Sequence, residues 1–289
     1  MNDKTARVLR FPLVRIILAI LAVAAPFALV STALNLFVTD KFLRRLGALL
    51  LAAIVLVAYR AYVRLVEKRA VTELSRHHAM RELAAGLALG ALLLSVSIGI
   101  LAALGVYQVT GNNGWRAMLA ILYGAILSGV LEEVVVRGVI FRIVEQSLGS
   151  WISLAISALL FGAAHLANHG ATLLNAGAIS IEAGVLLAAA YMVTRRLWFC
   201  IGIHIAWNFT QGGIFSGAVS GGVSHGLLQA KLVGPEWLTG GEFGVEASVV
   251  AFAVCTIAGV LLLAIALRKG EIIRPFWSRD SAQARGEIK

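Results

Sequence analysis

Apolar residues fill the chain in long, nearly uninterrupted runs, and most charged residues gather between these runs. A helix needs about 20 mostly apolar residues to cross a bilayer. The stretches that meet this requirement cover approximately residues 14–38, 46–66, 83–107, 117–146, 151–168, 176–194, 198–214 and 246–267. The pattern therefore predicts an all-α fold, a polytopic transmembrane bundle of about eight spans that forms a single integral membrane domain over residues 1–289.

Composition strengthens the membrane interpretation. Hydrophobic residues make up 60% of the 289 residues and charged residues 14%, against roughly 45–50% and about 25% in soluble domains. Cys200 and Cys255 lie in apolar runs and lack metal-ligand spacing. They are expected to be small, buried, apolar side chains.

The net charge of +10 agrees better with membrane topology than with nucleic acid binding. Lys and Arg concentrate near the N-terminus, over residues 60–81, at Arg195 and Arg196, and in the C-terminal tail. This bias predicts a multi-pass plasma-membrane protein with both termini in the cytoplasm and contacts with anionic lipid headgroups. The cluster from Lys41 to Arg45 is the exception.

Two further segments affect the predicted topology. The N-terminus has a basic start and an apolar run that reaches small residues at Ala22 to Ala25, as a signal peptide does. Because this run is longer than a typical signal sequence, it is predicted to be a retained anchor. The connection at about 215–245 is rich in glycine and is predicted to be a flexible or partly interfacial loop on the outer face.

The stretch LEEVVVRGVIF, Leu131 to Phe141, puts three ionisable groups into an apolar run. Glu133 and Arg137 are four residues apart and can pair side by side on a helix. Glu132 lies about 100° further round the helix, away from Arg137, and is a candidate general base. The alternative is that all three groups only hold helices together.

Other polar residues also interrupt predicted spans. In LLFGAAHLANHG, Phe161 and His165 share a helical face, and His169 lies at the end of the segment, outside the predicted site. A single histidine in a span is often only an interhelical hydrogen-bonding group, so a structural role for His165 is the alternative.

Two more motifs complete the polar set. In LWFCIGIHIAWNFTQGG, His204 and Asn208 share a helical face, and Glu182 is a carboxylate in the preceding span with no assigned role. A carboxylate base with imidazole and amide donors can activate water and hold an oxyanion, as peptide hydrolysis requires. No GxSxG or HExxH motif and no credible nucleophilic cysteine is present. An ion-coupled carrier and a non-catalytic scaffold or immunity factor remain alternatives.

Three motifs occur in order: EEVVVR (EExxxR), FGAAH (FxxxH) and HIAWN (HxxxN). Together they resemble the CAAX protease and bacteriocin-processing (CPBP) family of intramembrane proteases, to which the type II CAAX prenyl endopeptidases are related. The resemblance implies a catalytic core at about 115–215, where motif helices enclose a polar cavity inside the membrane.

The resemblance also implies roles for the motif residues. Glu132 would activate water with help from His165, while His204 and Asn208 would stabilise the oxyanion. The supporting residues would be Glu133, Arg137 and Phe161. All three motifs are intact, so the sequence predicts an active peptidase.

Metal dependence and substrate stay open from sequence. Glu132, His165 and His204 could supply three zinc ligands with one open position, but a metal-free, glutamate-dependent reaction is preferred and zinc is the alternative. The expected substrate is a membrane-associated protein or peptide, of CAAX type or related to bacteriocins. Short loops and the motif context favour a bacterial source.

Overall fold

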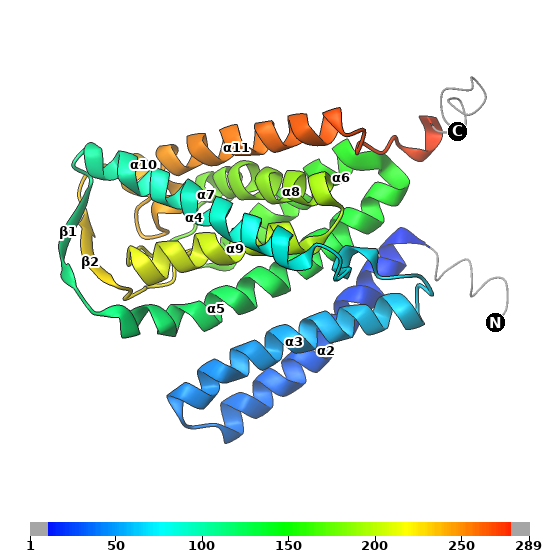
Figure 1. Ribbon diagram of the computed structural model, residues 1–289, viewed down its shortest axis with the longest axis horizontal. Coiled ribbons are helices and arrows are strands. Elements are labelled where there is room, and N and C mark those ends of the chain that lie inside the picture. The colour runs from blue at the N-terminus through cyan, green and yellow to red at the C-terminus, as the bar shows by residue number, and fades with distance from the viewer. Residues whose placement is uncertain (1–10, 279–289) are drawn as a thin grey trace.

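The computed structural model describes residues 11–278. This part of the chain is all-α apart from one two-stranded sheet, and Figure 1 shows its long helices gathered into a bundle. The basic residues Lys4, Arg7, Arg10, Arg279, Arg285 and Lys289, which contributed to the predicted topology, lie outside the described residues.

The described elements follow one another from α2 to α11. The helices are α2 (Pro12–Phe37), α3 (Lys41–Leu65), α4 (Ala79–Ala103), α5 (Trp115–Glu133), α6 (Arg142–Ala164), α7 (Leu173–Ile179), α8 (Leu186–Thr194), α9 (Leu197–Asn208), α10 (Glu236–Thr239) and α11 (Val249–Arg268). The π-helical segments are η2 (Val134–Phe141), η4 (Ser180–Val185) and η5 (Phe209–Ile214). The 3₁₀ turns are η1 (Thr72–Leu74), η3 (His165–Ala167) and η6 (Val245–Ala247).

Within the described residues, 6 helical runs are long and apolar enough to cross a membrane. The predicted number of eight is not confirmed, for two reasons. The predicted spans 117–146 and 151–168 lie in one helical stretch of 53 residues, Trp115–Ala167, which is interrupted by the non-helical backbone of Gly149. The predicted span 198–214 consists of α9, which has only 12 residues, and the π-helical η5.

Gly149 bends the long run between its two halves. Its φ of 79° and ψ of 171° are not helical, and an added Cβ would lie 2.7 Å from the backbone nitrogen of Pro275. The C-terminal segment packs into this bend, where the Ser150 amide donates to the Ile273 carbonyl at 2.9 Å. Only glycine accommodates both the positive φ and this close approach.

Helices α4 and α9 pack with their backbones almost in contact. An added Cβ at Gly86 would lie 2.2 Å from the Phe199 carbonyl oxygen, and one at Gly90 would lie 2.2 Å from that of Ile203. The sequence from Gly86 to Gly90 is a GxxxG pattern, which allows close approach of membrane helices. This contact fixes α9, the helix that carries two of the candidate site residues.

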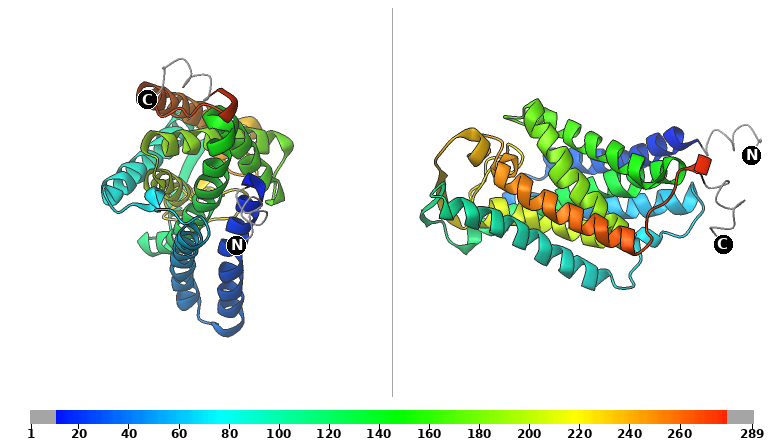
Figure 2. Two further views of the ribbon diagram at one scale, coloured as in Figure 1. Left: turned by 90° about the vertical axis from the view of Figure 1, so that its right-hand side faces the viewer. Right: turned by 90° about the horizontal axis from the view of Figure 1, so that it is seen from above.

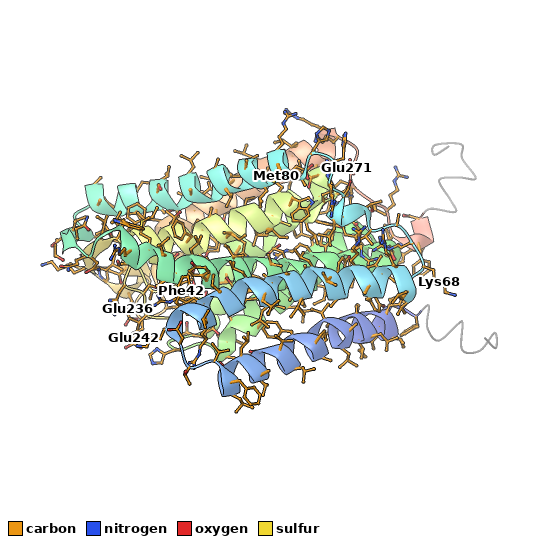
Figure 3. All side chains as sticks on the ribbon, turned by 60° about the horizontal axis from the view of Figure 1, so that its bottom comes forward. Phe42, Lys68, Met80, Glu236, Glu242 and Glu271 are labelled. Atoms are coloured by element: carbon orange, nitrogen blue, oxygen red, sulfur yellow. The ribbon has the colours of Figure 1, made fainter. Side chains whose placement is uncertain are left out.

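Helices α2 and α3 form a hairpin that stands beside the rest of the bundle (Figure 2). Only 11% of the most apolar stretch of α2 is buried. Figure 1 shows α2 beginning, α3 ending and α11 ending at one end of the bundle, which we call the terminal end. In Figure 3, Lys68 and Glu271 lie at this end and Glu236 and Glu242 at the other.

We call the opposite end the hairpin end, because the turn between α2 and α3 lies there (Figure 1). It is covered by the only sheet in residues 11–278. Strands β1 (Tyr107–Asn112) and β2 (Leu228–Leu232) pair antiparallel, with Tyr107 opposite Leu232 and a bulge after Val109. The hydropathy pattern did not predict this ladder. Part of the loop predicted to be flexible therefore has backbone partners and covers the end of the bundle.

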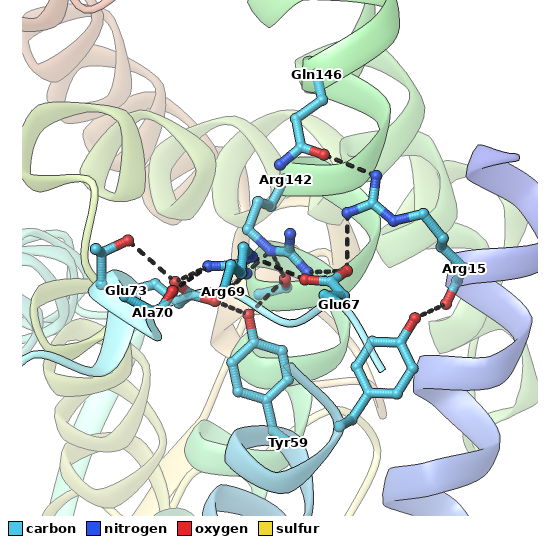
Figure 4. A network of polar contacts seen from close by, with 11 residues as sticks. Arg15, Tyr59, Glu67, Arg69, Ala70, Glu73, Arg142 and Gln146 are labelled. Atoms are coloured by element: carbon cyan, nitrogen blue, oxygen red, sulfur yellow. Dashed lines mark hydrogen bonds and ion pairs between the residues drawn. The ribbon is translucent and has the colours of Figure 1, made fainter. Parts of the chain in front are cut away.

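A network of ion pairs ties the α2–α3 hairpin to the bundle at the terminal end (Figure 4). Glu67 pairs with Arg15 at 2.8 Å, Arg69 at 2.8 Å and Arg142 at 3.0 Å. Burial acts to raise the pKa of Glu67, but Arg142 and Arg15 outweigh it and hold the value at about 2. The cluster joins α2, the end of α3 and the start of α6.

The same network reaches the π-helical segment η2. Glu73 is buried and accepts from Arg69 at 2.6 Å. The Tyr59 hydroxyl bonds Glu73 and lies 2.9 Å from the carbonyl oxygen of Gly138 in η2. Each carboxylate of this network therefore faces at least one guanidinium, as buried charges require.

Candidate active site

The candidate site lies where α5, α6 and α9 meet inside the bundle. The EExxxR motif runs from the end of α5 into η2, the FxxxH motif ends α6, and the HxxxN motif ends α9. Segments far apart in sequence therefore bring the three motifs together.

Glu133 is the hub of the buried part of the site. Its Oε1 accepts from Nη1 of Arg137 at 2.9 Å and lies 2.9 Å from Nδ1 of His204. The side chains of Glu133 and Arg137 are fully buried. One carboxylate oxygen thus joins the EExxxR and HxxxN motifs, and it fixes the His204 ring with Nδ1–H as the donor.

Arg137 has further partners that extend the hub towards the next helix. Its Nη2 donates to the Gly184 carbonyl at 3.0 Å, and its guanidinium carbon lies 4.7 Å from the centroid of the Phe161 ring. The stacking is a cation–π contact in a desolvated place. Arg137 therefore holds η4 and Phe161 in position.

Glu132 differs from its neighbour in environment. Its side chain is 34% exposed, while that of Glu133 is fully buried. Its Oε2 lies 3.8 Å from Nε2 of His204, too far for a hydrogen bond. As the helical geometry predicts, Glu132 points away from Arg137 and keeps its oxygens available.

His165 and Asn208 flank the exposed carboxylate. Nδ1 of His165 lies 2.8 Å from the carbonyl oxygen of Phe161, so Nδ1–H donates to that oxygen and Nε2 stays available. Nδ2 of Asn208 donates to Oγ of Ser128 at 3.0 Å, which orients the amide. Ser128 had no assigned role in the sequence.

Two adjoining hollows meet at these residues. The inner hollow, of about 40 Å³, is lined by Phe161, His165, Glu182, His204, Trp207, Asn208, Ser220 and Glu246, with further apolar residues. The outer hollow, of about 360 Å³, is lined by Ser128, Glu132, His165, Asn168, His169, Asn208 and the segment 219–222. His165, Asn208 and Ser220 line both, so the inner hollow has room for water-sized molecules beside a wider outer hollow.

The inner hollow also contains two carboxylates outside the motifs. Glu182 is 2% exposed, and its Oε2 has no hydrogen-bond partner within residues 11–278. Glu246 accepts from the amide and the hydroxyl of Ser220, at 2.6 and 2.7 Å. Burial raises the pKa of Glu246, which lies in η6, outside the spanning helices.

His169 lies at the edge of the site, away from the motif residues. Its side chain is 79% exposed and its Nδ1 is 3.8 Å from Glu242. It lines only the outer hollow. This position agrees with its exclusion from the predicted core site.

Three π-helical segments surround the site: η2 contains Arg137, η4 contains Glu182, and η5 follows directly after Asn208. A π-turn inserts one residue into a helix and changes the direction of the side chains that follow it; such turns are frequent at functional sites. Hydropathy does not reveal them, and none was predicted.

The three candidate zinc ligands are not gathered into a metal-binding group in the described residues. In the part of the chain that the structure describes, no group of three His, Cys, Asp or Glu side chains is arranged to hold a metal ion. Within the proposed set, Nδ1 of His204 is bonded to Glu133, and Nε2 is 3.8 Å from Glu132. A histidine that donates one ring N–H to a carboxylate can serve as a metal ligand or as a hydrogen-bond donor.

Among the side chains with hydrogen-bonding groups that line the site, Ser128, Trp207, Ser220 and Glu246 were not predicted from the sequence. Ser128 lies four residues before Glu132, so helical periodicity gave a usable signal for Ser128. Trp207 lies directly before Asn208. Ser220 and Glu246 come from the glycine-rich connection and the turn after it. Nothing in their local pattern indicated that they reach the site.

Comparison with known proteins adds one match. Residues 114–210 match the family described as type II CAAX prenyl endopeptidase Rce1-like. The matched range contains the EExxxR, FxxxH and HxxxN motifs. No curated protein and no solved structure matches the chain.

Proposed function

Because the chain carries a domain of the Rce1-like type II CAAX prenyl endopeptidase family at residues 114–210, we propose that it is an intramembrane endopeptidase with Glu132 as the general base. The observation that carries this proposal is the difference between two adjacent carboxylates. Glu133 is buried and bonded to two partners, while Glu132 is 34% exposed beside a hollow. A base needs free oxygens and access to water.

In the first step, a water molecule attacks the carbonyl carbon of the scissile peptide bond. Glu132 accepts a proton from this water, and Nε2 of His165 accepts a hydrogen bond from it. His165 is suited to this task because its Nδ1 is bonded to the Phe161 carbonyl. The new carbon–oxygen bond turns the carbonyl oxygen into an oxyanion.

The oxyanion is held by Asn208 and His204. Nδ2 of Asn208 has two hydrogens, of which one donates to Ser128 and the other is available. His204, when it carries both ring protons, donates through Nδ1 to Glu133 and through Nε2 to the oxyanion. Preorganised donors of this kind contribute roughly 2.7–4 kcal/mol each to transition-state stabilisation.

Collapse of the intermediate breaks the carbon–nitrogen bond. The proton taken up by Glu132 passes to the leaving amine, which restores the carboxylate for the next turnover. Glu133 and Arg137 do not exchange protons in this scheme. They hold His204 and Phe161 in position.

The substrate proposed is a membrane-associated protein or peptide, of CAAX type or related to bacteriocins. Access from the membrane is supported by α5 and α6, which carry the EExxxR and FxxxH motifs and belong to a helical stretch apolar enough to span a bilayer. The substrate test therefore uses both prenylated and unprenylated peptides.

The experiment is cleavage of a library of membrane-associated peptides by detergent-purified protein, with and without a chelator, together with metal analysis. Half of the library carries a prenylated C-terminal cysteine motif. We expect products from metal-free wild-type protein and none from the Glu132→Gln variant. Stoichiometric zinc with chelator-sensitive cleavage would contradict the metal-free mechanism, and equal cleavage by both proteins would contradict the role of Glu132.

A further inference from the structure

A basic pocket lies at the terminal end of the bundle, away from the candidate active site. Its volume is about 320 Å³, and it is formed by the last turns of α3 and the segment 70–76. Arg60, Arg64 and Arg76 line it together with Ser75. It shares no residue with the two hollows of the site.

The three arginines of this pocket have no protein counter-charge. Within residues 11–278, none of their guanidinium groups makes a hydrogen bond or ion pair, and no carboxylate lines the pocket. Arg60 and Arg64 are four apart on α3, so their like charges repel. An anion in the pocket would remove this repulsion.

Neighbouring arginines show that the lack of partners is local. Arg69 and Arg142 lie close by and pair with Glu67 and Glu73 (Figure 4). The carboxylates of this region are thus fully occupied by one set of arginines. The pocket is lined by the arginines that these carboxylates do not pair with, Arg60, Arg64 and Arg76.

The wall of the pocket is held firmly. Val71 and Leu74 are buried, and Glu73 between them is bonded to Arg69 and Tyr59. The Ser75 carbonyl accepts from the indole N–H of Trp198 at 2.8 Å. A preorganised wall lowers the entropic cost of binding a ligand there.

Exposed apolar side chains flank the pocket residues in the sequence. Helix α3 is a candidate span that ends at Leu65, and Leu65 and Met80 are 74% and 77% exposed. The pocket therefore sits at the level where a spanning helix leaves the bilayer. An occupant there meets guanidinium groups beside hydrocarbon.

We propose that this pocket binds the phosphate headgroup of an anionic phospholipid, whose acyl chains lie along the exposed end of α3. Guanidinium groups bind phosphate strongly and in a defined geometry. The Ser75 hydroxyl accepts from the His77 amide at 3.3 Å and keeps its own proton to donate to the ligand. Basic pockets between membrane helices bind anionic headgroups in this way.

The test uses the full-length protein and native mass spectrometry. Wild-type protein is mixed with phosphatidylglycerol or with phosphatidylcholine of the same acyl chains, and separately with inorganic phosphate. We expect wild type to retain phosphatidylglycerol over phosphatidylcholine, and the Arg60→Gln/Arg64→Gln/Arg76→Gln variant to lose this preference by about 10- to 100-fold.

A matched control removes three cations near the hairpin end, Lys41→Gln/Arg45→Gln/Arg116→Gln, and should keep the preference. All six side chains are exposed, so both variants should unfold at the wild-type temperature. If the pocket variant does not fold, the Arg60→Gln/Arg64→Gln double variant replaces it.

Three results would overturn the proposal. They are equal retention of the two lipids by wild type, an equal loss of preference in the control variant, and binding of inorganic phosphate without any preference between lipids. The last result would assign the pocket to a free phosphate. None of these results depends on peptide cleavage, so the proposal stands or falls independently of the proposed function.

Discussion

The two polar clusters of this protein are built differently. At the terminal end, Glu67 and Glu73 are each paired with arginines and hold the α2–α3 hairpin to the bundle. In the candidate site, Glu133 is bonded in the same way, but Glu132 next to it has no partner within hydrogen-bond distance in the described residues. Buried charges that are satisfied support the architecture, and the polar group left over marks the place for chemistry.

Removing the Glu133 carboxylate should have the largest effect on stability. The Glu133→Gln variant leaves Arg137 buried with no carboxylate, which costs roughly 3–5 kcal/mol. We expect a clear drop in the unfolding temperature in detergent, measured by the fluorescence of the tryptophans. Glu242→Gln, which changes a carboxylate that is 78% exposed, should unfold as wild type does; a Glu133→Gln protein as stable as this control would contradict the hub role.

The terminal network should give the fold a measurable acid sensitivity. The folded pKa of Glu67, about 2, lies below its ordinary 4.5. The stability that Glu67 contributes is therefore complete above about pH 4.5 and is lost as the pH falls towards 2. Its size is on the order of 3 kcal/mol, because the pKa is lowered from 4.5 to about 2.

Unfolding temperatures recorded from pH 6 to pH 2 test this. Wild type should lose stability through that window, while Glu67→Gln should start lower and fall less. Glu236→Gln, an exposed carboxylate at the hairpin end, should follow the wild-type curve. Parallel curves for wild type and Glu67→Gln would show that Glu67 is not the titrating group.

Close packing of α4 on α9 predicts an effect that combines stability and activity. Gly90→Ala would put a Cβ 2.2 Å from the Ile203 carbonyl oxygen, and overpacking of this kind costs roughly 1–3 kcal/mol. Moving α9 also displaces His204 and Asn208, so cleavage should fall as well.

Gly99→Ala is the matched control on the same helix, because no atom lies within 4 Å of the added Cβ. It should leave both the unfolding temperature and the cleavage rate near wild type. Equal behaviour of the two variants would mean that the helix contact does not position the site.

The smallest effect is expected at Ser128. Ser128→Ala removes the group that orients the Asn208 amide and should lower kcat about tenfold, a loss near 1.4 kcal/mol in the transition state. KM and the unfolding temperature should change little. Ser97→Ala, which loses only a bond to its own helix at Leu93, is the control, and an equal kcat in both variants would argue against an orienting role.

The sequence predicted the fold class and the helical geometry of the motifs well. Long apolar runs are sufficient to predict membrane helices, and a separation of four residues correctly indicated that Glu133 and Arg137 meet. The predicted number of eight spans is not confirmed. The predicted division between residues 146 and 151 coincides with the non-helical Gly149, but α9 has only 12 residues and is not among the candidate spans.

The long-range parts of the site could not be predicted. Glu246 and Ser220 reach the inner hollow only because the chain after η5 folds back over the end of the bundle, a tertiary effect with no local pattern. The contact between His204 and Glu133 joins residues 71 positions apart. The zinc set was chosen by residue type, and within residues 11–278 its members are not gathered into a metal-binding group.

The most direct test of the central claim compares the adjacent carboxylates under identical conditions, with cleavage rate and unfolding temperature measured on Glu132→Gln and Glu133→Gln. Glu132→Gln should unfold at the wild-type temperature and cleave about 10²- to 10⁴-fold more slowly, as expected for loss of a general base. Glu133→Gln should unfold at a markedly lower temperature. A folded Glu132→Gln protein that cleaves at the wild-type rate would contradict the assignment of Glu132 as the base.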